Sequence, residues 1–494
     1  MLGSPEADRR GARHRLLEDG ADLLLTATRS SSCQLAVWTG EDALLSVTAG
    51  RNHDGSACED RDLNPGYCMS KLVVAAAVLE CERTEGLDLE QPVRELVDLP
   101  YVNRDATVLD VMEHRAGLVE PSVVTWRMTP EISRPGLLPL APPTMRAGYS
   151  DLLASIVLCA LVERCSGTSA LAFIEERVLG PSEAGDLLLW GSSSAAVFPG
   201  VAGLPDRTIP LLSELLPDQR ESVEPSTGVF ASARGVALLL RWLLFTGPGS
   251  ADLRSRLRDR LDGDLRTTFD PVLGRSATFA FGMMADLPAH GVLTSGPRTV
   301  GHTAAITNWL AVADLASEEV RVGYTNGIAP SDAAVVANRH ALDRAMQGDL
   351  EAIGQGDRER DRTPGRAERS RQGPDRRLES STPLADRLRR VCLAADPAVE
   401  VRFVLAFARP NASSIVRCEF AGGGLAAVDQ VKDAHEVDAV IVSEEADVLR
   451  WLDDPAARLG ALLLDGTISV TGDLWVLSPL EHWAWATAIA LSTS

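Results

Sequence analysis

A segment near residue 350 constrains the fold more than any other feature, because it divides the chain. Residues 354–382 read GQGDRERDRTPGRAERSRQGPDRRLESST and show no apolar periodicity. Such a stretch buries too little apolar surface to offset the entropy lost on ordering. We therefore expect a disordered, Arg- and Asp-rich linker over residues 351–382, between units at residues 1–350 and 383–494. The interleaved acidic residues favour a solvated linker over a nucleic-acid-binding arm.

Composition excludes several classes of protein. The formal net charge of −21 argues against nucleic acid as a partner, since phosphate binding needs clustered Lys and Arg. The first 20 residues lack the apolar stretch of a signal peptide, and no apolar run is long enough for a membrane span. The eight cysteines are scattered without C-x-x-C pairs, which favours reduced thiols and a cytoplasmic location. The eight histidines form no H-x-x-x-H cluster, so we expect neither a metal nor another cofactor.

The N-terminal unit mixes helices and strands. The Ala-rich run from Lys71 to Glu85 predicts a helix, and residues 152–165 predict another that Ser166-Gly167 stops. Residues 309–313 and 320–324 predict two paired strands around a turn at 314–319. These elements indicate an α/β (α+β) fold with helices flanking a sheet.

Cys68 and Lys71 form the first candidate catalytic pair. Their i, i+3 spacing places both side chains on one face of a helix. A thiol at a helix N-terminus beside an ammonium group is favoured as the thiolate, the form that acts as a nucleophile. Alone, a C-x-x-K pattern is more often a packed cysteine beside a lysine that extends to the surface, so its context decides.

Two later motifs supply that context. Tyr149-Ser150-Asp151 precedes an apolar helix, and a tyrosine near a lysine can act as a general base, because the cation stabilises the phenolate. The second motif is Gly301-His302-Thr303-Ala304-Ala305, which comes before the predicted strand pair.

These motifs and the text around them resemble the β-lactamase/penicillin-binding-protein family, and in particular the class C β-lactamase-related serine hydrolases. The resemblance extends over residues 20–345, in the family's order. It includes GLDLEQPV at 86–93 and ATVLDVMEHRAGL at 106–118, where His114 is expected to be structural. It implies the β-lactamase/transpeptidase-like fold, an antiparallel sheet flanked by helices plus a helical subdomain. Cys68 stands where the family has its nucleophilic serine.

The resemblance also implies roles for the candidate residues. Cys68, Lys71 and Tyr149 would be catalytic, and the backbone N–H groups of Cys68 and Ala305 would form the oxyanion hole. His302, Thr303 and Asp151 would bind substrate. Two of these positions depart from the family pattern. Asp151 replaces an asparagine and, when ionised, donates no hydrogen bond. Ala304 replaces a glycine and adds a side chain at the strand edge against which substrate lies.

A cysteine nucleophile changes the expected chemistry. It forms a thioester, which reacts with amines in preference to water more than an oxygen ester does. We therefore expect acyl transfer in secondary metabolism, with hydrolysis of an ester or amide as the closest variant. The partners would be a small-molecule acceptor and an acyl donor, free or bound to CoA or a carrier protein. The alternative is a catalytically silent binding or scaffold protein that keeps the fold.

The C-terminal unit resembles a sterol-carrier-type lipid-binding domain, a small α+β fold. The matching text is VDAVIVS at 437–443 and LDGTISVTGDL at 464–474. Strands are expected at 399–408, 439–442 and 467–470, with a helix at 444–452. Binding of a lipid or acyl chain and formation of a homodimer are both compatible with this unit.

Overall fold

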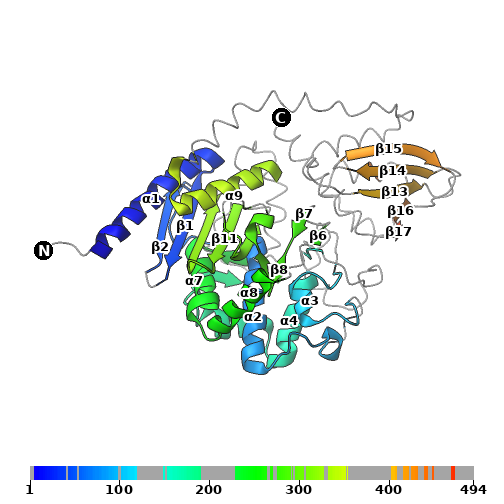
Figure 1. The fold of residues 1–494 in the computed structure, drawn as a ribbon, viewed down its shortest axis with the longest axis horizontal. Coiled ribbons are helices and arrows are strands. Elements are labelled where there is room, and N and C mark those ends of the chain that lie inside the picture. Colours follow the sequence, from blue (N-terminus) through cyan, green and yellow to red (C-terminus); the bar gives the residue numbers. More distant parts are fainter. Residues whose placement is uncertain are drawn as a thin grey trace.

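The N-terminal unit is built on a seven-stranded sheet (Figure 1). The computed structural model describes residues 5–353, with its longest gaps at 119–147 and 191–227 and short ones elsewhere, and also several segments between residues 402 and 472. The strand order is β2-β1-β12-β11-β10-β9-β8, and every adjacent pair is antiparallel. The strands are β1 (Ser32–Thr39), β2 (Leu45–Gly50), β8 (Phe279–Ala280), β9 (Met283–Ala285), β10 (Thr299–Ala304), β11 (Asn308–Asp314) and β12 (Glu319–Thr325).

Helices cover both faces of this sheet. On one face, α1 packs against α9, and both contact the sheet. On the other face, α7 packs on β1 and β12 and continues into a π-helical turn that leads to α8. The helices are α1 (Pro5–Thr28), α7 (Ala233–Arg241), the π-helix Trp242–Thr246, α8 (Ser250–Asp262) and α9 (Asp332–Gln347).

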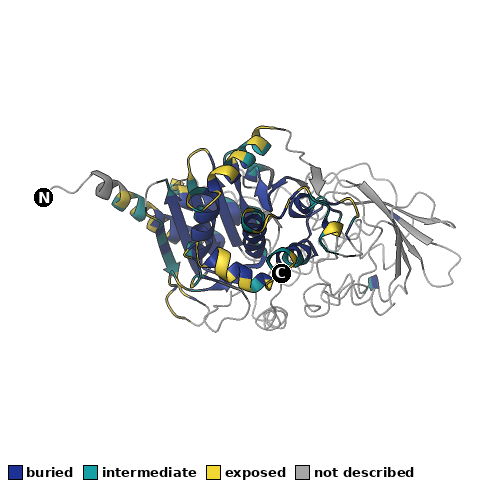
Figure 2. Ribbon diagram, turned by 90° about the horizontal axis from the view of Figure 1, so that it is seen from below, coloured by how far each residue is buried: buried dark blue, intermediate teal, exposed yellow. Residues whose placement is uncertain are grey.

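The alternation of side chains along the strands produces two hydrophobic cores. In β1, Leu35 and Val37 belong to the core beneath α1 and α9, whereas Ala36 and Trp38 belong to the core on the other face. This is the period-two pattern of a strand that is buried on both sides. Figure 2 shows the sheet and the helices next to it as the most buried part of the described chain.

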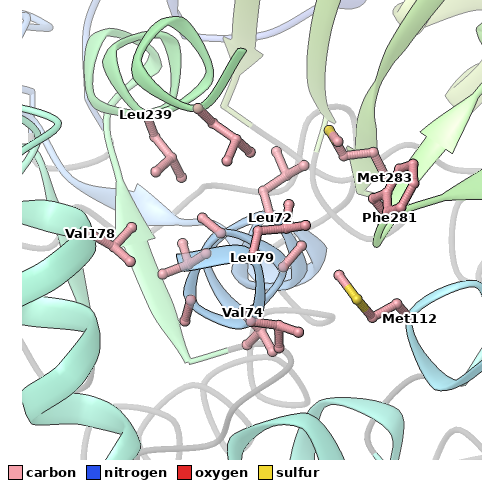
Figure 3. Close-up of a cluster of buried hydrophobic side chains, with 14 of the residues drawn as sticks. Leu72, Val74, Leu79, Met112, Val178, Leu239, Phe281 and Met283 are labelled. Carbon is pink, nitrogen blue, oxygen red and sulfur yellow. The ribbon is translucent and has the colours of Figure 1, made fainter. Parts of the chain in front are cut away.

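The helix α2 (Ser70–Glu85) lies in the centre of the second core (Figure 3). Its residues 70–81 are all buried, as expected for a helix that is apolar on every side. Leu72 and Leu79 pack among side chains from α7, β9 and α3, including Leu239, Met283 and Met112. Gly86 ends the helix in a left-handed conformation (φ 74°), which glycine adopts without strain.

Shorter elements complete the helical subdomain. α3 begins with a capping box in which the Thr107 side chain accepts from Asp110 N–H and the Asp110 carboxylate accepts from Thr107 N–H. α4 packs against α2, and a small sheet of order β3-β5-β4 contacts, through β5, the 3₁₀ turn that precedes α2. The elements are α3 (Val108–Met112), α4 (Leu153–Ser166), α5 (Ala170–Ile174), the π-helix Glu175–Leu179, β3 (Asn64–Pro65), β4 (Leu188–Trp190) and β5 (Val229–Ala231), with a separate hairpin of β6 (Thr268–Asp270) and β7 (Arg275–Ala277).

Within the described chain, no single helix is both long and apolar enough to cross a bilayer. Only α4 taken together with Ala170–Leu179 reaches that length and composition, and these two segments are bent by 79°.

The predicted N-terminal elements are confirmed. The helix expected at 71–85 is α2, the helix at 152–165 is α4, and Gly167 follows α4 with a positive φ of 72°. The predicted strand pair is β11 and β12, joined by the turn after Asp314. The antiparallel sheet with helices on both faces agrees with the predicted α/β (α+β) fold.

The described part of the C-terminal unit forms a five-stranded mixed sheet of order β15-β14-β13-β16-β17. Its strands are β13 (Arg402–Ala408), β14 (Ile415–Ala421), β15 (Gly424–Val431), β16 (Ala439–Val442) and β17 (Ser469–Gly472), and β13 with β16 is the parallel pair. The strands predicted at 399–408 and 439–442 correspond to β13 and β16, and the one at 467–470 overlaps β17. Residues 354–401 and most of the predicted 444–452 helix lie outside the described residues. The linker, the unit boundaries and the sterol-carrier assignment therefore stay predictions.

Truncation of α2 tests its central place in the core. Leu72 is fully buried, so Leu72→Ala should lower the free energy of unfolding by about 2–5 kcal/mol. Leu16 on α1 is 43% exposed, and Leu16→Ala should change it by less than about 0.5 kcal/mol. Urea denaturation followed by circular dichroism measures both. Equal losses for the two variants would contradict the central position of α2.

Candidate active site

The turn before α2 is held by contacts with two distant strands. Gly66 N–H donates to the carbonyl oxygen of Val229 at 2.7 Å, and Val229 N–H donates to Ser70 Oγ at 3.0 Å. On the other side, Trp309 Nε1 donates to the carbonyl oxygen of Pro65 at 3.0 Å. A Cβ atom at Gly66 would lie 2.5 Å from Val229 Cγ1, so the close approach requires glycine. These contacts fix the backbone that carries Cys68.

Cys68 lies in a short 3₁₀-helix, Tyr67–Met69, which runs directly into α2. Tyr67 is buried and has a positive φ of 45°, an unfavourable conformation for a residue with a β-carbon. The Cys68 side chain is partly exposed and packs against both hydrophobic cores. The prediction of a thiol at the N-terminus of the α-helix is thus refined, because a 3₁₀ turn precedes the α-helix that contains Lys71.

Lys71 and Tyr149 are in contact and buried. The Lys71 Nζ atom lies 4.9 Å from the centroid of the Tyr149 ring, and each residue is only 5% exposed. A cation over an aromatic face is attracted by the ring quadrupole, and more strongly when both groups are withdrawn from water. Tyr149 also stacks on Phe279, with ring centroids 5.9 Å apart. The structure therefore brings together two of the three predicted catalytic residues next to the turn that carries the third.

His114 supports the segment that contains Tyr149. Ser150 N–H donates to His114 Nδ1 at 3.1 Å, and the His114 and Tyr149 rings are 4.8 Å apart. Burial, and then the charge of Lys71, lower the pKa of His114 well below its ordinary value. His114 is accordingly a neutral hydrogen-bond acceptor that holds the backbone after Tyr149, in keeping with its expected structural role.

Residues 301–304 of the third motif lie in β10, which packs beside residues 67–69. The His302 ring is fully buried and lies 6.2 Å from the Tyr149 ring. Burial and the Lys71 charge lower the pKa of His302 to about 3, so this ring is also neutral at pH 7. The Thr303 hydroxyl donates to Met284 Sδ at 3.6 Å, which directs it toward β9. Asp151 and Ala305 lie outside the described residues, so their predicted roles stay predictions.

Several residues near the site gave no usable signal in the sequence. Phe279 stacks on Tyr149, and the charge of Arg339 on α9 contributes to the lowered pKa of His302. Trp309, in a strand predicted from its apolar pattern, has its ring nitrogen bonded to the turn before Cys68. Each of these contacts joins segments that are distant in the sequence, so local patterns could not indicate them.

An antiparallel sheet flanked by helices, with a buried central helix that begins just after the Cys68 turn, is the arrangement of the β-lactamase/transpeptidase-like fold, and the predicted fold class is confirmed. The Beta-lactamase family model matches residues 25–346, and the chain belongs to this family. No curated protein matches the sequence.

Solved structures show the same fold at low sequence identity. A family VIII carboxylesterase has a TM-score of 0.53 at 16% identity, covering 67% of this chain and 97% of its own. A penicillin-binding protein homologue from Caulobacter crescentus has a TM-score of 0.52 at 15% identity, covering 67% and 97%. The D-amino acid amidase from Ochrobactrum anthropi SV3, complexed with D-phenylalanine, has a TM-score of 0.51 at 14% identity, covering 68% and 99%.

Another similar structure extends further along the chain. SurE with D-Leu has a TM-score of 0.50 at 16% identity and covers 88% of this chain and 90% of its own. The matched 88% of this chain is longer than residues 1–353, so the similarity includes part of the C-terminal unit.

The neutral state of His302 predicts an acid-sensitive fold. Because its folded pKa of about 3 lies below the ordinary 6.5, the unfolded chain binds the proton first, and stability is lost as the pH falls from 6.5 toward 3. Between pH 7 and pH 5 this histidine should remove about 2 kcal/mol from the free energy of unfolding.

Urea denaturation at the two pH values tests this expectation. The wild type should lose about 2 kcal/mol more than His302→Asn over this interval. The control His14→Asn changes a side chain that is 43% exposed on α1 and should keep the wild-type dependence. An unchanged dependence in His302→Asn would show that His302 is charged, or solvated, in the folded protein.

Proposed function

We propose that the protein is an acyl enzyme that works through a thioester on Cys68 and transfers the acyl group to an amine or alcohol. Hydrolysis of an ester or amide is the closest variant of this reaction. One observation carries the proposal: the partly exposed Cys68 thiol lies on a tightly held turn, and Lys71, three residues later, is buried in contact with the Tyr149 ring. This arrangement leaves the nucleophile accessible and keeps its proton carriers out of bulk water.

The first half-reaction forms the acyl enzyme. The Cys68 proton passes to Tyr149, which accepts it as a phenolate stabilised by the Lys71 ammonium, and the thiolate attacks the carbonyl carbon of the donor. Backbone N–H groups of Cys68 and Ala305 stabilise the oxyanion in this proposal. The tetrahedral adduct then collapses, the bond to the leaving thiol, alcohol or amine breaks, and the leaving group takes the proton from Tyr149.

The second half-reaction releases the acyl group. The acceptor amine or alcohol attacks the Cys68 thioester and gives its proton to the same Lys71–Tyr149 pair. The C–S bond breaks, and the proton returns to the Cys68 thiolate. The apolar surroundings of Tyr149, which include Phe279, limit the access of water and so favour transfer over hydrolysis.

The proposed substrates follow from this chemistry and from the related structures. The similar structures include a carboxylesterase and a D-amino acid amidase, which supports an ester, thioester or amide of a small acid as the donor. A CoA- or carrier-bound acyl group suits a cytoplasmic enzyme of secondary metabolism. In this proposal the C-terminal unit presents the acyl chain as a lipid-binding domain or joins two copies of the chain.

A catalytically silent scaffold is the second candidate function. Asp151 and Ala304 favour it, because both depart from the family pattern at positions expected to contact substrate. Lys71 and Tyr149 favour catalysis. A protein that only binds has no need of a buried ammonium group in contact with a tyrosine ring next to a half-exposed thiol.

Acylation of Cys68 tests the proposal directly. Incubation with activated acyl thioesters should add one acyl mass to the intact protein, and peptide mapping should place it on Cys68. Lys71→Met should slow this step by about 10²–10⁴-fold, the range for loss of a positioned acid–base group. Cys165→Ala removes another partly exposed thiol and serves as the matched control, with wild-type labelling. Identical labelling of wild type and Cys68→Ala would rule out the thioester and favour the scaffold.

Partition of the acyl enzyme tests transfer against hydrolysis. With a primary amine present, the wild type should give more amide than free acid, since the thioester prefers amines to water. Cys68→Ser forms an oxygen ester instead, so its ratio of amide to acid should fall. Chromatography of the products at several amine concentrations measures the ratio. Free acid as the sole product at every concentration would make the protein a hydrolase.

A further inference from the structure

One ring nitrogen of His302 has no hydrogen-bond partner among the residues that the structure describes. Its Nε2 atom is buried and forms no hydrogen bond with any part of the chain that the structure describes. Its other nitrogen, Nδ1, lies 2.8 Å from the carbonyl oxygen of Thr303. A carbonyl oxygen only accepts hydrogen bonds, so Nδ1 must carry the proton. In the neutral ring, Nε2 is then a lone-pair acceptor.

The surroundings of the ring keep it neutral. The residue is fully buried, and the groups whose charges act on it are Lys71 from α2, His290 from the turn after β9, and Arg339 from α9. All three disfavour a second positive charge, and burial disfavours it most. At neutral pH this position thus offers a hydrogen-bond acceptor without charge.

The position of this acceptor connects it with the proposed acyl site. β10 packs beside residues 67–69, and the His302 ring lies 6.2 Å from the Tyr149 ring that Lys71 contacts. A buried acceptor without a donor is unfavourable, because the group has lost its hydrogen bonds to water and gained none. A bound molecule with an N–H or O–H group at this position would supply the missing hydrogen bond.

We infer that His302 selects substrates that present an uncharged N–H or O–H donor to its Nε2 atom, and disfavours substrates that place a carboxylate there. The inference rests on the proposed function for the location of the bound substrate. An ionised carboxylate has only acceptor oxygens. It would therefore give Nε2 no hydrogen bond and would repel the Nε2 lone pair. The donor group belongs either to the acyl donor, as an amide N–H near its reactive carbonyl, or to the acceptor, as a hydroxyl.

Matched substrates separate these two sources. In the first arm, acylation is measured with the N-acetylcysteamine thioesters of N-acetylphenylalanine and N-acetyl-N-methylphenylalanine, each as both enantiomers. In the second arm, transfer from one donor is measured to ethanolamine and to 2-methoxyethylamine. In one of the two arms, the substrate with the N–H or O–H group should have a kcat/KM about tenfold higher than its methylated analogue. This is the usual effect of making, rather than losing, a hydrogen bond to a buried polar group.

Variants of His302 test whether this residue causes the preference. His302→Ala should abolish the preference in the arm that shows it, and His302→Asn, which keeps an acceptor, should retain part of it. His302→Lys should reverse the selection in favour of a donor with a carboxylate in place of the N-acetyl group. The exposed control His14→Ala should behave as the wild type. No preference in either arm, or a preference that survives in His302→Ala, would overturn the inference.

A binding measurement tests the inference without any reaction at Cys68. Calorimetry with Cys68→Ala compares the N-methylamides of N-acetylphenylalanine and N-acetyl-N-methylphenylalanine, and repeats the comparison with His302→Ala added. If no thioester acylates Cys68, the proposed function fails and this measurement alone decides. Tighter binding of the N–H ligand that depends on His302 then supports the inference, and equal binding or no binding refutes it.

Discussion

The attachment of the turn before α2 to two distant strands is the constraint on which the site depends. Tyr67 adopts a positive φ that its own side chain disfavours, so the local sequence alone would not maintain this turn. Hydrogen bonds from Val229 to Ser70 and from Trp309 to Pro65 span 159 and 244 residues and offset that strain. Because the turn is held on both sides, Cys68 remains partly exposed while Lys71, three residues later, enters the core.

The buried position of Lys71 influences the ionisation of the neighbouring histidines. Burial and the Lys71 charge both lower the pKa values of His114 and His302, so neither ring carries a charge at neutral pH. Each neutral ring has a distinct task. His114 accepts a hydrogen bond from the backbone next to Tyr149, and His302 has a buried Nε2 atom without a hydrogen-bond partner among the described residues. In the proposed mechanism, proton transfer is therefore left to Lys71 and Tyr149, while His114 positions Tyr149 and His302 selects the substrate.

The sequence predicted elements whose signals are local. The Ala-rich run before Gly86 predicts α2, because apolar residues on every side are typical of a buried helix, and apolar runs around a polar turn predict β11 and β12. The order of the three motifs also indicated the family and two site residues that do meet, Lys71 and Tyr149. The 3₁₀ turn at Cys68 and the ionisation of His302 could not be predicted this way, because both depend on groups far away in the chain. The roles of Asp151 and Ala305 remain predictions.

The central claim is that Cys68 is a nucleophile activated by the buried lysine behind it, and the rate of thiol alkylation tests this most directly. Iodoacetamide labelling, followed by peptide mass spectrometry between pH 5 and pH 9, compares Cys68 with Cys165, a partly exposed thiol on α4. We predict that Cys68 is labelled faster than Cys165 below pH 7 and that Lys71→Met removes this advantage. Equal pH profiles for the two thiols, unchanged in Lys71→Met, would contradict the claim and leave the fold as a scaffold.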